Sequence, residues 1–281
     1  MKQFKGKSIY EARGKASEYS KYAASFYVGC YFGCHYCFNK KGRFANVLGG
    51  DTPTLKSCFK DEAHALEVFE KELQQNLPEL QEYGLFFSFT TDPMLPETKM
   101  ETTRAIIICI ENGVPCKILT KCTDWCNYVD MWFVGCKNRD FLCSEWKKYI
   151  AFGFTLTGHD ELEPNASTNT ERIEAMRKLH DAGFKTWASI EPIIDFVSSA
   201  EMMRRTVDFC DLYKVGLMSC KKYDKWEVEK FVSYCIGSLA DKDDNVKKIY
   251  FKDSLLERAG IERSDLPNNC ITRDYNIFTN K

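Results

Sequence analysis

The feature that most constrains the fold is an alternation of short apolar runs with helices that have one apolar face. The runs "LFFSFT" at 85–90 and "CKILTK" at 116–121 have the length and composition of buried parallel strands. The segment 65–77 places Phe69 and Leu73 on one face of a helix. Strands that alternate with such helices form parallel sheets with helical crossovers.

The whole chain follows this rhythm. Expected strands lie at 24–29, 85–90, 116–121, 149–157, 185–193, 212–219 and 247–253. Expected helical segments lie at 65–77, 100–112, 124–139, 169–183, 198–210 and 225–239. The pattern predicts an α/β protein built as a complete or partial TIM barrel of the (β/α)6 type.

The length predicts a single domain, because 281 residues with 44% apolar composition can bury one large core. We expect an N-terminal arm at 1–23, a barrel core at 24–220 and closing elements at 221–281. The arm carries an excess of lysine and arginine, which indicates a solvated tail or a weak basic face.

The chain shows no apolar leader and no run near the roughly 18 apolar residues of a membrane helix, so we expect a cytoplasmic protein without membrane contact. In that compartment thiols stay reduced, so the 14 cysteines are expected to be core residues, metal ligands or reactive groups. The net charge of -1 argues against strong overall attraction to nucleic acid.

The segment "GCYFGCHYCFN" follows the first expected strand, at the end of a barrel where ligands bind. It holds Cys30, Cys34 and Cys37 on a loop that contains two glycines. A disulfide would leave one cysteine over, and structural zinc normally takes four protein ligands. An iron-sulfur cluster fits best, because three thiolates would leave one iron open to a substrate or cofactor.

The spacing C-x3-C-x2-C, with Tyr36 before the last cysteine, resembles the signature of the radical S-adenosylmethionine (SAM) superfamily. The blocks "SFTTDPMLPETKMETTRAI", "ILTKC" and "GFTLTGHDELEPNASTNTERIEAMRKLHDAGFKTWASIEPI" resemble its spore photoproduct lyase and DNA-repair-photolyase-like branch. The resemblance covers most of the chain. It implies that Cys30, Cys34 and Cys37 ligate one four-iron four-sulfur cluster whose fourth iron binds SAM, with Tyr36 near the SAM amino group or adenine.

The resemblance also implies further SAM contacts. Lys121 would pair with the SAM carboxylate, which a flexible ammonium group can do as a point charge. Thr155 and Thr157 would bind the ribose or carboxylate, and the backbone around Ile190 and Glu191 would contact the adenine edge. Each has a plainer interpretation: threonine suits a strand, and lysine is common on surfaces.

Two charged residues in "LEPNASTNTER", the segment after the expected strand at 149–157, have a structural interpretation. We expect Glu163 and Arg172 to form an ion pair that steadies this loop, because such pairs are common. A catalytic role for the two is the alternative.

One departure from the branch limits the function. Spore photoproduct lyases carry a hydrogen-donating cysteine near the end of their second strand, where this chain has Phe89. This argues against photoproduct repair. Cys122, which we expect to be exposed at the barrel mouth, or Cys220, after the expected strand at 212–219, could replace that cysteine as the hydrogen-atom donor. Free cysteine is also a common core residue.

A second metal centre is an alternative use of the other cysteines. Cys122, Cys126, Cys136 and Cys143 lie in one segment, but their spacing is irregular compared with known cluster or zinc motifs. We therefore expect one cluster.

The leading hypothesis is a radical SAM enzyme of lyase or oxidoreductase type. It would cleave SAM reductively to a 5'-deoxyadenosyl radical that abstracts hydrogen from an unidentified substrate, such as a nucleobase or nucleoside. A peptide- or protein-modifying radical SAM enzyme, either an activase or a peptide maturase, is the alternative within the superfamily. A non-catalytic iron-sulfur electron carrier or redox sensor is the alternative of another class. The enzyme hypotheses imply a reductant such as flavodoxin or ferredoxin.

Overall fold

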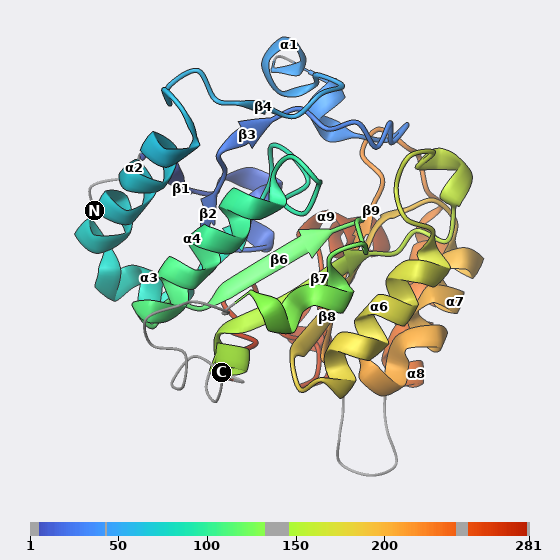
Figure 1. The fold of residues 1–281 in the computed structure, drawn as a ribbon. Coiled ribbons are helices and arrows are strands. Elements are labelled where there is room, and N and C mark those ends of the chain that lie inside the picture. Colours follow the sequence, from blue (N-terminus) through green and yellow to red (C-terminus); the bar gives the residue numbers. More distant parts are fainter. Residues whose placement is uncertain (1–5, 43, 133–145, 240–246, 280–281) are drawn as a thin grey trace.

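A computed structural model describes residues 6–42, 44–132, 146–239 and 247–279 (Figure 1). Its centre is an eight-stranded sheet in the order β1-β2-β5-β6-β7-β8-β9-β10. Only the β1–β2 pair of this sheet is antiparallel among the described strands. The sheet strands are β1 Ile9–Glu11, β2 Tyr22–Ala24, β5 Leu85–Phe87, β6 Cys116–Thr120, β7 Ile150–Thr155, β8 Lys185–Ile193, β9 Leu212–Leu217 and β10 Lys248–Phe251.

Helices cover the outer face of the curved sheet, with α2, α3 and α4 on one flank and α6, α7 and α8 on the other (Figure 1). The described helices are α1 Ala45–Leu48, α2 Glu62–Gln75, α3 Leu77–Tyr83, α4 Lys99–Glu111, α6 Asn169–Asp181, α7 Phe196–Thr206, α8 Lys225–Leu239 and α9 Asp253–Ala259. No helix in the described ranges is long and apolar enough to cross a membrane.

The predicted partial barrel is confirmed, although individual elements differ from those expected. The segment 24–29, expected as one strand, divides between β2 and the short β3 (Tyr27–Val28), which pairs antiparallel with β4 (Thr54–Leu55). Of the helical segment expected at 124–139, the structure describes a short 3-10 helix, Cys126–Met131, and residues 133–145 lie outside the described ranges.

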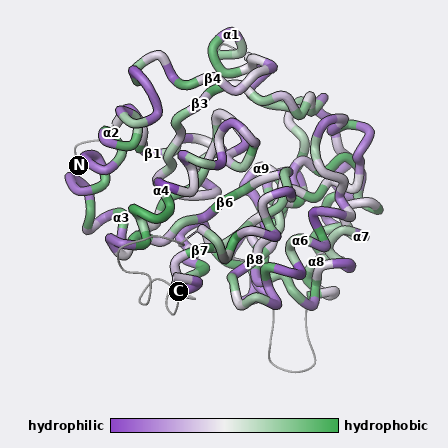
Figure 2. Tube along the Cα trace, in the orientation of Figure 1, coloured by the Kyte–Doolittle hydropathy of each residue, from purple (hydrophilic) through white to green (hydrophobic). Residues whose placement is uncertain are grey.

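Two apolar cores lie on opposite faces of the sheet, because successive strand residues point to opposite sides. The outer core, between sheet and helices, includes Phe69 and Phe152, whereas the inner core, inside the barrel, includes Phe86, Trp187 and Tyr250. In Figure 2, green apolar stretches lie along the central strands, and the outer helices carry both purple polar and green apolar stretches.

The N-terminal arm enters the barrel instead of forming a free tail. Its cations Lys7, Arg13 and Lys15 are exposed, as expected for solvated charges, but Glu18 and Tyr19 are buried. The sequence prediction of a solvated tail is therefore wrong for the end of the arm, because barrel side chains supply partners for its polar groups.

Three lysines hold this part of the arm. Lys117 on β6 donates to the Tyr19 carbonyl oxygen at 3.1 Å, and Lys214 on β9 donates to the Glu18 and Tyr19 carbonyl oxygens at 2.5 and 3.2 Å. Lys252, which follows β10, lies 3.5 Å from the Glu18 carboxylate. The arm thus forms part of the inner wall of the barrel.

The sheet has two edge strands, β1 and β10. The C-terminal segment lies across the open side between them, as its contacts show. Ile271 donates its backbone N–H to the Ile249 carbonyl at 2.9 Å, and Ile271 and Ile277 belong to the inner core. Arg273 contacts Asp253 at 2.5 Å, and the Asn276 amide donates to the Glu82 carbonyl at 3.1 Å.

Candidate functional site

The three cysteines of the motif lie on one loop that begins directly after β3. Gly29 and Gly33 both have positive φ, at 84° and 72°, a conformation that glycine adopts without strain. A side chain at Gly29 would place its Cβ 2.4 Å from the Thr52 carbonyl oxygen, so the loop passes close to the β4 strand. The Cys30 N–H donates to the Gly50 carbonyl at 2.9 Å, which fixes the start of the loop.

The donor set fits an iron-sulfur cluster in its chemistry. Cys30, Cys34 and Cys37 are free and half-buried, and Cys30 and Cys34 pack against the outer core. Burial raises the pKa of Cys30 to about 12 and also raises the pKa of Cys34, so both are thiols until a metal displaces their protons. In the described ranges, no three His, Cys, Asp or Glu side chains converge as the ligands of a single ion do. Cluster ligands bind separate irons, so this loop needs no such convergence.

Beside this loop, the carboxylate of Glu163 joins three of the singled-out side chains. Its Oε2 lies 2.6 Å from Arg172 Nη2, and its Oε1 accepts a hydrogen bond from the Tyr36 hydroxyl. Lys121 Nζ lies 4.0 Å from the same Oε1 and 5.5 Å from the centroid of the Tyr36 ring. The expected ion pair is thus present, and it also positions Tyr36 and Lys121.

Asp92 was not predicted from the sequence to lie near the candidate site, yet it bonds to the strand end that carries Lys121. Its carboxylate accepts from the Thr120 hydroxyl at 2.7 Å, from the Lys121 N–H at 2.8 Å and from the Met94 N–H at 3.0 Å. Burial raises the pKa of Asp92 despite these hydrogen bonds. Because Asp92 follows β5 and Lys121 follows β6, these bonds fix Lys121 relative to the neighbouring strand end.

Thr155 and Thr157 lie at the end of β7 and are buried. The Thr155 carbonyl accepts from Arg172 Nη1 at 2.8 Å, and the Thr157 hydroxyl accepts from the His159 N–H at 3.2 Å. The Asn169 side chain accepts the Thr157 N–H at 3.0 Å, which ties the strand end to the start of α6.

Ile190 and Glu191, near the end of β8, face opposite sides of the sheet. Ile190 is part of the outer core. Glu191 points inward, where it accepts the Tyr19 hydroxyl at 2.5 Å and lies 2.8 Å from Lys252 Nζ. Its side chain therefore belongs to the network that holds the N-terminal arm.

Phe89 lies in the barrel, stacked on Phe86 with ring centroids 4.3 Å apart. Cys122 is only 6% exposed and packs in the outer core, so the expectation that it is exposed at the barrel mouth is wrong. Local bonds cause this burial: the Cys122 N–H donates to the Thr120 hydroxyl at 2.9 Å, and its carbonyl accepts from the Trp125 indole at 2.9 Å. Cys220 is exposed.

The alternative of a second metal centre falls only partly on described residues. Cys126 is buried, as Cys122 is, whereas Cys136 and Cys143 lie outside the described residues.

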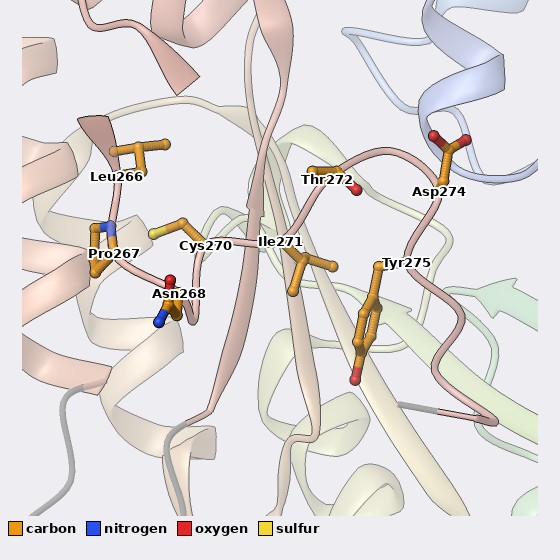
Figure 3. A pocket seen from close by; sticks show the side chains of 8 residues that line it. All are labelled: Leu266, Pro267, Asn268, Cys270, Ile271, Thr272, Asp274 and Tyr275. Atoms are coloured by element: carbon orange, nitrogen blue, oxygen red, sulfur yellow. The ribbon is translucent and has the colours of Figure 1, made fainter. Parts of the chain in front are cut away.

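A hollow of about 340 Å³ lies elsewhere, along the C-terminal segment (Figure 3). Its lining runs from Leu266 to Tyr275, and Cys270 points toward Leu266 and Pro267 in this view. It contains none of the predicted site residues, so the candidate site remains the strand ends around the cysteine loop.

Comparisons with known proteins bear on the fold. No family model matches the chain. The chain is 25% identical to the uncharacterized protein MJ0683 of Methanocaldococcus jannaschii, over 72% of each protein. It matches spore photoproduct lyase complexed with dinucleoside spore photoproduct with a TM-score of 0.55 and 17% identity, covering 83% of this chain and 66% of that one. It matches Streptococcus suis SuiB bound to S-adenosylmethionine with a TM-score of 0.54 and 15% identity, covering 86% of this chain and 50% of that one.

These likenesses confirm the partial-barrel fold that the sequence predicts, an architecture shared with spore photoproduct lyase and SuiB. The chain spans 50% to 66% of the length of these solved neighbours. At such low sequence identity these likenesses define the architecture, whereas the chemistry depends on the residues of this chain.

Proposed function

We propose that this chain is a radical SAM enzyme whose site lies at the strand ends around Cys30, Cys34 and Cys37. The main supporting observation is that Glu163 contacts Tyr36, Lys121 and Arg172 beside the loop that holds these three free cysteines. The cysteines would hold one four-iron four-sulfur cluster. When bound, that cluster supplies the electron that cleaves SAM to methionine and a 5'-deoxyadenosyl radical, which then abstracts hydrogen from the substrate.

The surrounding residues bind and orient SAM in this proposal. Lys121, held by Glu163 and by the Asp92 bond to its backbone, offers an ammonium group to the SAM carboxylate. Thr155 and Thr157 lie at the next strand end, and the backbone at Ile190 and Glu191 follows on β8. Phe86 and Phe89 fill the barrel interior with apolar rings, which exclude water from a radical reaction.

We propose that the substrate is a nucleobase or nucleoside. The likeness to a lyase whose structure holds a dinucleoside supports this choice. Phe89, in place of the lyase's cysteine, argues for a reaction other than photoproduct repair. A peptide or protein substrate is the alternative. We further propose a single domain that works in the cytoplasm and receives electrons from a flavodoxin or ferredoxin.

The test is anaerobic reconstitution with iron and sulfide, reduction with dithionite, and measurement of 5'-deoxyadenosine after SAM is added. We expect about four irons per chain, whereas about eight would indicate a second cluster. Cys34→Ala should lose most of its iron, whereas Cys58→Ala, at an exposed cysteine outside the motif, should keep it. A loaded chain that forms no 5'-deoxyadenosine would instead be an electron carrier or redox sensor.

SAM binding tests the role of Lys121 separately. Lys121→Met should weaken SAM binding by at least about tenfold, since a charge-assisted contact is lost. Lys99→Met, at the start of α4, is the matched control.

A further inference from the structure

The loop between β7 and α6, residues 156–168, supports the cysteine loop. The Asn165 amide donates to the Tyr31 carbonyl at 2.8 Å, and Glu163, in the same loop, accepts the Tyr36 hydroxyl. The 156–168 loop also begins directly after β7, where the candidate SAM-binding threonines lie. Its position therefore decides where several candidate side chains lie relative to the three cysteines.

On its other side, the 156–168 loop packs on the start of α7, which lies beside α6 in Figure 1. An added Cβ at Gly158 would lie 2.9 Å from the Ser198 Cβ on this helix, so loop and helix are in close contact. The next residue is His159, whose Nε2 lies 2.5 Å from Asp195 Oδ2. The other oxygen of Asp195 accepts the Ser198 N–H at 2.7 Å and caps α7. His159 thus joins the loop to the first turn of α7.

The ring of His159 faces a carboxylate on each side. Nδ1 lies 2.7 Å from Glu161 Oε1, and Nε2 lies 2.5 Å from Asp195 Oδ2. An ionised carboxylate only accepts hydrogen bonds, so both ring nitrogens have to donate, and only the imidazolium has two N–H groups. A neutral ring keeps one of the two bonds and turns a lone pair toward the other carboxylate.

The protonation equilibria of the three groups agree with this geometry. Burial lowers the pKa of His159, but the hydrogen bonds to Asp195 and Glu161 outweigh burial and raise the pKa above its ordinary value of 6.5. The bond from His159 lowers the pKa of Glu161. Burial raises the pKa of Asp195, but the bonds from Ser198 and His159 outweigh it and lower the pKa. The three groups therefore form a charged cluster at neutral pH.

Two other charged groups lie near this cluster. Asp160, next to His159 in the loop, uses its Oδ1 to accept the backbone and side-chain amides of Asn169 at 2.7 and 2.6 Å. Lys221, from the loop after β9, donates to the backbone carbonyl directly before Asp195. The bonds to the ring itself come from its two carboxylate neighbours, so these set its charge.

We propose that His159 is a positioning residue, which as an imidazolium fastens the 156–168 loop to α7 and thereby holds Thr157 and Glu163 in place for SAM. The inference rests on the proposed function, because it assigns these side chains to a SAM site. Since folding raises the pKa of His159, the fastening is complete below pH 6.5 and is lost as the pH rises through the raised value. SAM affinity should fall over the same range.

Hydrogen exchange of the reconstituted protein, measured by mass spectrometry on peptides within 156–168, tests the fastening without SAM. At about pH 6, His159→Gln should exchange at least about threefold faster than the wild type. At about pH 9 the two should exchange alike, because the wild-type ring is then neutral. Asp195→Asn keeps an acceptor for the Ser198 N–H and should lose the same protection. His180→Gln, at the far end of α6, is the matched control and should exchange as the wild type does.

Calorimetric titration of the same reconstituted proteins with SAM tests the positioning role. The wild type should bind SAM at least about threefold more tightly than His159→Gln at about pH 6, and the difference should vanish at about pH 9. Comparing variants at one pH cancels the titration of SAM itself. His180→Gln should follow the wild type at both pH values.

The outcomes separate this inference from the proposed function. Equal exchange of the wild type and His159→Gln at about pH 6 would overturn the fastening, whether or not SAM binds. A difference in SAM affinity that is the same at both pH values would overturn the positioning role, because a merely structural histidine gives no pH dependence. If the wild type binds no SAM while the exchange rates differ as expected, the proposed function fails and the fastening by His159 stands.

Discussion

Glu163 and Arg172 form an ion pair with 2.6 Å between Oε2 and Nη2, and both side chains are fully buried. Arg172 also donates to the carbonyls of Thr155 and Ser167 at 2.8 and 2.7 Å. The pair thus joins the end of β7, its following loop and the start of α6. Its other carboxylate oxygen accepts the Tyr36 hydroxyl, so the same contact supports the fold and the cysteine loop.

Glu163→Gln should destabilise the protein by about 3–5 kcal/mol, because it leaves the Arg172 charge buried without its carboxylate. Urea unfolding monitored by circular dichroism measures the change. Glu161→Gln, at an exposed carboxylate in the same loop, is the control and should cost far less. Equal losses in the two variants would contradict the structural role of the pair.

Tyr19→Phe should cost about 1.5–3 kcal/mol, because the Tyr19 hydroxyl bonds the Glu191 carboxylate inside the barrel. The Ser189 hydroxyl, 2.7 Å from the Tyr19 oxygen, would lose the same partner. Tyr128→Phe is the matched control, since Tyr128 is 60% exposed. An unchanged unfolding free energy for Tyr19→Phe would show that the arm does not depend on this contact.

Periodicity explains how much of the fold the sequence could predict. The helix expected at 225–239 is α8, and the strand expected at 185–193 is β8, with the same bounds. Both segments have strong apolar patterns, so local propensity and packing against the core favour the same element. The Glu163–Arg172 contact was predictable too, because the two charges lie on one loop and the helix that follows it.

The inner network of the barrel was not predictable in the same way. Glu18 and Tyr19 lie in a short irregular arm without periodicity, and their partners Lys214 and Lys252 are almost 200 residues or more away in sequence. Such contacts depend on the closure of the sheet, which no local pattern encodes. The burial of Cys122 was not predictable for a related reason, since a position at a strand end does not decide which core a side chain joins.

Gly153→Ala should destabilise the protein by about 1–3 kcal/mol through overpacking. An added Cβ would lie 2.1 Å from Trp187 Cε2 and would overlap this indole ring, which is buried in the barrel. Gly237→Ala provides a control of opposite sign: no atom lies within 4 Å of its added Cβ, and alanine favours the α8 helix by about 0.5–1 kcal/mol. Thermal unfolding of both variants checks the prediction, which fails if Gly153→Ala is as stable as the wild type.

The lysines inside the barrel should make stability depend on alkaline pH. Burial lowers the pKa of Lys117 from 10.5 to about 8. Between these values the unfolded chain binds a proton that the folded chain does not, so the unfolding free energy contributed by Lys117 rises with pH.

Lys117→Met should remove this contribution, whose slope is at most about 1.4 kcal/mol per pH unit. Urea unfolding from about pH 7 to about pH 10 should therefore show a steeper rise for the wild type than for Lys117→Met, whereas Lys222→Met, at an exposed site, should follow the wild type. Parallel curves for the wild type and Lys117→Met would mean that Lys117 stays protonated in the folded barrel up to its ordinary pKa.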